Sequence, residues 1–227
     1  VKYTININIS PKDTYLIHKN QSAVLINGQI WMRHNLGANT NIDPDQGLGT
    51  KELFGNFYQW GNPNSVALST ETTVNQNWSM NNIGKWNAGT ETNPLKAMND
   101  PCPSGYRIPT ITELQFLLTN LVSLNHGTWE DAPTNYSASK IFVSKRKESI
   151  RFIVPAQGWF SIKPYGTLMI PTDIQGRGVM GAFWTSSVTQ TTRTMGLEVE
   201  KNIIAILHPA ASNYNKFKSH NIRCIAE

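Results

Sequence analysis

The chain has 227 residues, a formal net charge of +5 and a charged fraction of 15%. This length fits one large domain, which buries roughly 70% of its unfolded surface and therefore needs no metal merely to fold. The basic residues are scattered except at Lys145-Arg146-Lys147, so the basic stripe of a nucleic-acid binder is missing, and no run of about 18 apolar residues could insert into a membrane. The abundance of Asn, Thr, Ser and Gly favours a loop-rich extracellular protein with β-structure over a cytosolic helical enzyme.

Residues 1–10 alternate apolar and polar side chains, which predicts a half-buried antiparallel strand. Pro11-Lys12-Asp13 predicts a turn or linker after it. The strand either belongs to the fold that follows or is the last strand of a separate preceding domain. Because residue 1 is Val and no signal peptide is present, we expect a processed form or a fragment of a longer protein.

The next segment predicts a hairpin, because an Asn-Gly dipeptide separates two apolar runs within residues 23–32. Residues 61–100 are mostly polar and predict a long loop. A loop of that length is usually functional or disordered. Trp78 and Trp86 within it indicate that the loop packs onto the domain.

Residues 100–118 contain a cysteine, a tight turn, a short strand and the start of a helix. Thr110 or Thr112 can cap this helix, and Glu113 lies three residues after Thr110, at the spacing of a capping box. Apolar residues at three- and four-residue steps predict a helix over 111–122.

Strands are predicted at 149–154, 181–187, 195–199, 203–207 and 222–225, the last four as a meander. Residues 155–178, which contain Gly and Pro, predict a second long irregular region. One or two helices, short strands and long loops together predict the α+β class.

Five sequence pieces stand in the order typical of one family: 27–37, 55–61, 102–110 (Cys-Pro-Ser-Gly-Tyr-Arg-Ile-Pro-Thr), 181–187 and 221–224. Through them the chain resembles the Fibrobacter succinogenes major paralogous domain of secreted and surface proteins in Bacteroidetes. The resemblance implies a C-type-lectin-like fold for residues 13–227. It also implies that residues 1–12 are the last strand of a preceding fimbrillin-like domain plus a linker, and that the parent is a pilus tip or surface adhesin protein.

The two cysteines, Cys102 and Cys224, allow a single pairing. The resembling fold joins a cysteine near a helix start to one in the final strand, which implies a Cys102–Cys224 disulfide. The alternative is two buried free thiols in a reducing compartment.

The candidate ligand-binding residues lie in two loops. Exposed Trp and Tyr rings can stack on sugars while Asp, Asn and Arg bond the hydroxyls. The first loop follows strand 149–154, where the resembling fold carries its ligand-binding loop, and the second precedes the final strand. The candidates are Trp159, Tyr165, Asp173, Arg177, Asn213 and Tyr214. The alternative for Trp159 is a packing role beneath the loop.

No cofactor is expected. The one metal considered as an alternative is calcium. Asp43-Pro-Asp45 offers two carboxylates, but a calcium site needs about six to eight oxygen ligands. The sugar-binding triplets Glu-Pro-Asn and Trp-Asn-Asp of animal lectins are missing from the chain. Asp and Pro also favour a plain turn at this position.

The expected function is extracellular ligand binding or adhesion without catalysis, by a protein secreted or held at the cell surface. The partners would be a host or microbial glycan or protein, with other pilus subunits as further candidates. One alternative is a structural pilus subunit that assembles through residues 1–10. Another is a secreted hydrolase, because paired carboxylates need only proximity in space.

Overall fold

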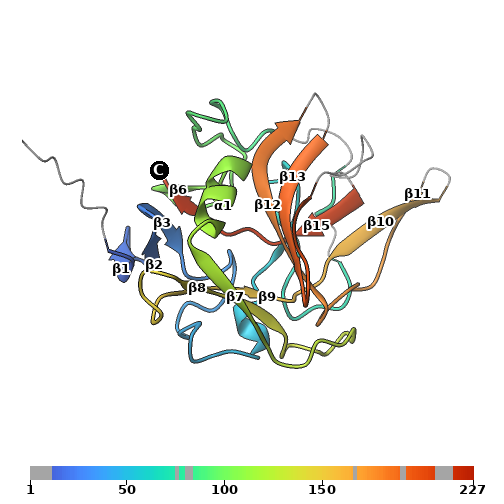
Figure 1. The fold of residues 1–227 in the computed structure, drawn as a ribbon. Helices are drawn as coiled ribbons and strands as arrows, with labels where there is room; N and C mark the ends of the chain where they lie inside the picture. The colour runs from blue at the N-terminus through green and yellow to red at the C-terminus, as the bar shows by residue number, and fades with distance from the viewer. Residues whose placement is uncertain (1–11, 75–76, 80–83, 166–167, 190–192, 208–216) are drawn as a thin grey trace, which may run out of the picture.

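The computed structural model describes residues 12–74, 77–79, 84–165, 168–189, 193–207 and 217–227, and it is nearly all-β (Figure 1). Over this part the chain forms sixteen strands, one eight-residue α-helix and one 3-10 turn. The predicted α+β, C-type-lectin-like fold was therefore wrong. Much of the difference lies in segments expected to be irregular, because residues 155–178 contribute two strands.

The strands form four antiparallel sheets. The first has the order β1 (Thr14–His18), β2 (Gln21–Ile26), β3 (Gln29–Met32), β16 (Ile225–Ala226) and β6 (Tyr106–Arg107). The second has the order β11 (Leu168–Pro171), β10 (Phe160–Tyr165), β15 (Lys218–His220), β4 (Phe57–Gln59) and β5 (Ser65–Ala67). The third is the meander β12 (Met180–Thr189), β13 (Arg193–Glu200) and β14 (Ile204–Leu207). The fourth contains β7 (Leu121–His126), β8 (Ser139–Ser144) and β9 (Arg151–Pro155).

The predicted hairpin is confirmed between β2 and β3. Asn27 and Gly28 have φ values of 54° and 77°, as a type I′ turn requires, and Ile26 pairs with Gln29 across it. The predicted meander is confirmed for its first three strands. Its fourth strand, β16, instead joins β3 and β6 in the first sheet.

The helix α1 (Ile111–Leu118) begins with the predicted capping box, in which Thr110 and Glu113 bond each other's backbone N–H groups. It ends four residues earlier than predicted. The amide of Asn27 donates to the carbonyl oxygens of Phe116 and Leu117 at 3.2 and 3.3 Å, so those two carbonyls are satisfied by a side chain. Leu121 then becomes the first residue of β7. Among the described residues no helix is long and apolar enough to cross a membrane.

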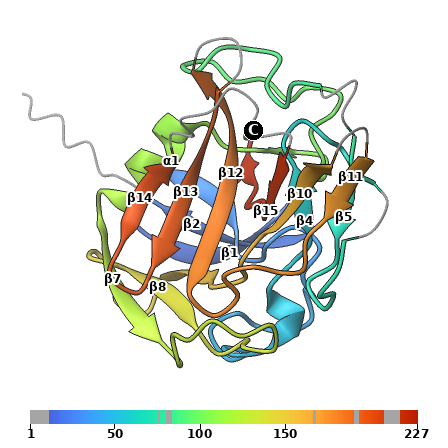
Figure 2. The ribbon, with the colours of Figure 1, turned by 90° about the vertical axis from the view of Figure 1, so that its right-hand side faces the viewer.

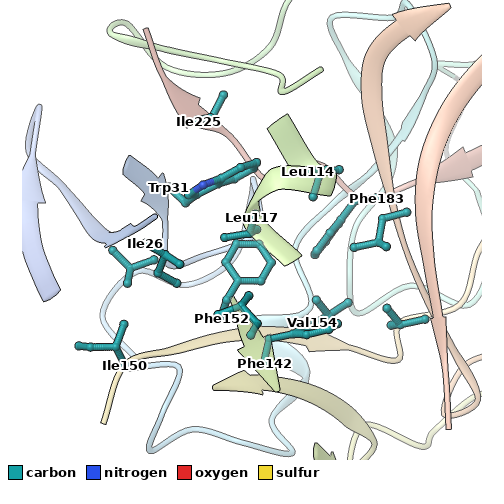
Figure 3. Packing of buried hydrophobic residues seen from close by; sticks show 14 residues of the cluster. Ile26, Trp31, Leu114, Leu117, Phe142, Ile150, Phe152, Val154, Phe183 and Ile225 are labelled. Carbon is teal, nitrogen blue, oxygen red and sulfur yellow. The ribbon is translucent and has the colours of Figure 1, made fainter. Parts of the chain in front are cut away.

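The larger core cluster lies between α1, the first sheet, the third sheet and the inner face of the fourth sheet (Figure 3). Trp31 and Phe152 meet edge to face with ring centroids 5.8 Å apart. A second cluster surrounds Cys102 and Cys224 and contains Trp60, Trp86 and Trp184. Because Trp86 is only 1% exposed, the long loop does pack onto the domain as predicted.

Candidate functional site

The predicted disulfide is present and joins the turn before α1 to the segment that leads into β16. Cys102 and Cys224 are bonded, with Cα atoms 6.0 Å apart and 122 positions of separation. Beside it, the buried carboxylate of Asp100 accepts hydrogen bonds from the backbone N–H groups of Cys102 and Ile108, both at 2.8 Å. Lys96 donates to Asp100 and to the carbonyl oxygen of Tyr106. These contacts hold the turn as one rigid unit.

The candidate surface begins at Trp159, which precedes β10 and is partly exposed. Its backbone pairs with Gln175 through two hydrogen bonds of 2.9 Å. Gly176 packs against the indole, since an added Cβ there would lie 2.2 Å from a ring carbon. The Nζ atom of Lys218 lies 5.0 Å from the ring centroid. A ligand that stacks on this indole would therefore meet Lys218 at the ring.

Arg177 has a structural role and does not line the candidate surface. The residue is buried, and its guanidinium donates to the carbonyl oxygens of Pro133, Ser69 and Glu71 at 2.8 to 3.2 Å. It also donates to the Tyr136 hydroxyl at 3.0 Å and lies 4.9 Å from the centre of that ring. Burial lowers the pKa of this guanidinium. Arg177 thus ties separate loops together, with its side chain directed away from solvent.

The other candidates lie nearby or outside the described residues. Asp173 is exposed two positions before Gln175. Tyr165 ends β10, and only its backbone is described. Asn213 and Tyr214 fall in 208–216, outside the described residues.

The second sheet places β15 beside the first candidate loop. Ser161 of β10, two positions after Trp159, pairs with Lys218 of β15. Figure 2 shows β15 between β12 and β10, and Figure 1 shows the β10–β11 hairpin projecting from the body of the domain. Segments about 50 residues apart in the chain therefore border one surface.

Sequence reasoning missed Lys218 and Glu198, which interact electrostatically beside this surface. Burial lowers the pKa of the Lys218 ammonium, while the Glu198 charge raises it. Burial and the charge of Glu200 raise the pKa of the Glu198 carboxyl, which Lys218 lowers. No local motif links these residues, because they come together through β12, which pairs with β13 and contacts β15.

The carboxylates of Asp43 and Asp45 lie in a turn and accept hydrogen bonds from neighbouring side chains. Arg33 donates to Asp43 at 2.7 and 2.8 Å and to Asp45 at 3.0 Å. The Tyr15 hydroxyl donates to Asp45 at 2.5 Å, and the Arg33 bonds lower the pKa of Asp43. Among the described residues no group of three or more His, Cys, Asp or Glu side chains could hold a metal ion. This turn fits the plain structural interpretation of Asp43-Pro-Asp45.

The buried imidazole of His220 is expected to make the protein less stable as the pH falls. It is fully buried against Trp184, with ring centroids 4.3 Å apart, and burial lowers its pKa from 6.5 to about 3. The unfolded state binds a proton more readily, so this contribution to stability is complete above pH 6.5 and is lost as the pH falls toward 3. When the pH is lowered from 7 to 5, we expect the contribution of His220 to reduce the free energy of unfolding by about 2 kcal/mol.

The measurement is urea unfolding at both pH values for the wild type and for His220→Leu. The variant should lose about 2 kcal/mol less than the wild type over this interval, whatever its absolute stability. The other titrating groups are common to both proteins and cancel in the comparison. Equal losses would show that His220 is protonated in the folded state.

The comparisons with known proteins place the chain in a family. The model of the Fibrobacter succinogenes major domain matches residues 24–226, nearly the whole length. Comparison with curated proteins and with solved structures finds no significant match. On this match the chain belongs to the Fibrobacter succinogenes major domain family.

Proposed function

We propose that this domain is an extracellular binding module that presents the β10–β11 hairpin and the segment entering β15 to a glycan. The pairing of Ser161 with Lys218 carries the proposal, because it sets Lys218 beside the loop region that contains Trp159 and Asp173. Trp159 and Lys218 offer an indole edge and an ammonium group, and exposed Asp173 offers a hydrogen-bond acceptor in the same loop region. Aromatic and polar groups side by side on loops of a rigid scaffold are typical of binding surfaces.

The scaffold beneath this surface supports a binding role. Arg177 fixes the strand-connecting loops from the inside, and Gly176 lets the chain approach the indole closely. A surface that is ordered before binding loses less conformational entropy when the ligand arrives. A place at the tip of a pilus or on the cell surface fits such a module and is part of the proposal.

Glycan binding is tested on an array of mammalian and mucin glycans, with calcium and then with chelator. Lys218→Ala and Asp173→Ala should each weaken binding about tenfold, which corresponds to about 1.4 kcal/mol. The ammonium and the carboxylate are proposed to bond sugar hydroxyls directly, so removing either loses one charge-assisted hydrogen bond.

Lys51→Ala is the matched control, because this lysine is exposed on the 3-10 turn η1 (Lys51–Leu53) outside the proposed surface. It should bind as the wild type does. Loss of binding with chelator alone would assign the interaction to calcium. Wild-type binding by both variants, or no glycan bound at all, would rule out this surface as the glycan site and move the search to protein ligands.

A second candidate is a structural subunit of a pilus, which residues 1–10 would join to the sheet edge of a neighbouring subunit. One observation favours it: within the described residues β1 pairs only with β2, and its Ile17 is 72% exposed. An open strand edge with an exposed apolar side chain is a ready site for pairing with another chain. Crosslinks of residues 3–9 between two copies would support this candidate, whereas crosslinks within one chain would support an intramolecular role of the same residues.

A further inference from the structure

The outer face of the fourth sheet carries an open apolar groove of about 510 Å³. Its lining includes Val122, Leu124, Val143, Lys145, Glu148 and Arg151. Val122 and Leu124 are 48% and 53% exposed, although they lie in the middle of a strand. The opposite face of the same sheet packs into the main core through Leu121, Phe142 and Phe152. Ile141 and Ile153 lie on the same outer face and are buried, so the groove is the part of this face next to β7 that no described segment covers.

The strand beside this groove is also an edge. Within the described residues β7 pairs only with β8, so its outer backbone groups are open to a further strand. An exposed edge with apolar side chains promotes aggregation, and folded proteins commonly cover such edges. A covering segment should therefore alternate apolar and polar residues over about six positions, the length of β7.

Residues 3–9 have this pattern, with Tyr3, Ile5, Ile7 and Ile9 at alternate positions. The chain that follows them is anchored at the end of the groove. The buried carboxylate of Asp13 accepts a hydrogen bond from Ser144 at 2.5 Å and lies 3.8 Å from Arg146. Ser144 lines the groove and pairs with Leu121, the first residue of β7.

We propose that residues 3–9 dock along β7 of the same chain and cover this groove. Ser10, Pro11 and Lys12 connect the segment to Asp13, so its last residue would lie close to Leu121. The segment runs toward Asp13 while β7 runs away from Leu121, which makes the two antiparallel. At about 3.3 Å per residue, the seven residues of the segment extend roughly 23 Å, enough to follow all six residues of β7. The alternate isoleucines then face Val122 and Leu124, and the asparagines face away.

Chain connectivity favours residues 3–9 of the same chain as the segment that fills the groove. A segment tethered to Asp13 by three residues reaches the groove at a far higher effective concentration than a separate molecule does. The neighbouring edge strand β1 presents one strongly exposed apolar side chain, Ile17, whereas the groove presents two beside a hollow. The proposal is independent of the glycan-binding surface, which lies on the second sheet.

The test is disulfide crosslinking in the full chain. Both native cysteines are bonded to each other, so introduced pairs are the only free thiols. Leu124→Cys is combined in turn with Ile5→Cys, Ile7→Cys or Ile9→Cys. After mild oxidation, at least one pair should form an intramolecular crosslink about tenfold faster than the matched pairs with Asn6→Cys or Asn8→Cys, whose side chains point to the other face. Non-reducing gels and peptide mass spectrometry give the rates and the linked sites.

Three results would overturn the proposal. Equal rates for the isoleucine and asparagine positions would show that the segment does not lie along β7 in a fixed orientation. Faster crosslinking of the isoleucine positions to Ile17→Cys would place the segment on β1. Crosslinked dimers at low protein concentration would show that residues 3–9 cover another copy, as the assembly candidate requires.

Discussion

Replacing both Cys102 and Cys224 with alanine is expected to lower the free energy of unfolding by about 4 kcal/mol. The bond closes a loop with a sequence separation of 122, and chain-entropy arguments give about 4–5 kcal/mol for a loop of that size. The linked positions lie in the second core cluster, with Trp60, Trp86 and Trp184 around them. Reduction therefore frees the turn before α1 from the segment that leads into β16 and loosens the packing of the indoles.

Urea unfolding with and without reductant measures this effect. The wild type should lose about 4 kcal/mol on reduction, whereas the double-alanine variant should be insensitive to reductant. The variant thus controls for effects of the reductant on the rest of the protein. A wild type that unfolds at the same urea concentration in both conditions would show that the bond adds little to stability.

Local structure could be predicted from the sequence where neighbouring residues determine it. The Asn27-Gly28 turn and the Thr110–Glu113 capping box depend on interactions within a few positions, and both are confirmed. The end of α1 could not be predicted, because the capping amide of Asn27 comes from about 90 residues earlier. Helix propensity alone favours continuation through Leu121, and a distant side chain decides otherwise.

The fold class was wrong for a related reason. Strands such as β15 have three residues and no alternating pattern of their own. β15 forms because β10 lies on one side of it and β4 on the other, from segments more than 50 residues earlier in the chain. Short strands that are defined by their neighbours are indistinguishable from loops when the sequence is considered alone.

The structure places the predicted site residues in different environments. Trp159 and Asp173 belong to a partly exposed loop region, but Arg177 lies in the interior, where it bonds backbone carbonyl groups. A sequence does not distinguish an arginine that meets a ligand from one that holds loops together, since both uses require the same donors. Lys218 was missed because the feature that identifies it, the indole 5.0 Å away, comes from another strand.

Arg223→Met is expected to lower the free energy of unfolding by about 3–5 kcal/mol, although methionine has nearly the same length. Arg223 is 3% exposed, and its guanidinium lies 4.6 and 5.3 Å from the ring centres of Phe152 and Phe183. It donates to the side-chain oxygen of Asn35 at 2.6 and 2.9 Å and to the carbonyl oxygens of Met32 and Ile153. Within the described residues no carboxylate forms an ion pair with it. The charge is stabilised by dipoles and aromatic rings, and these acceptors lose their donor when methionine replaces it.

Arg33→Met is the matched control, since Arg33 also donates to side-chain oxygens and lies over an aromatic ring, that of Tyr15. Its ionic partners Asp43 and Asp45 have side chains 42% and 21% exposed, so water can replace the lost bonds. Because solvent screens such pairs, we expect a loss of about 1 kcal/mol there. Urea unfolding of both variants gives the comparison. Equal losses at the two positions would show that the acceptors around Arg223 find water or other donors, and that this buried cation is not needed to join β3, β9 and the final segment of the chain.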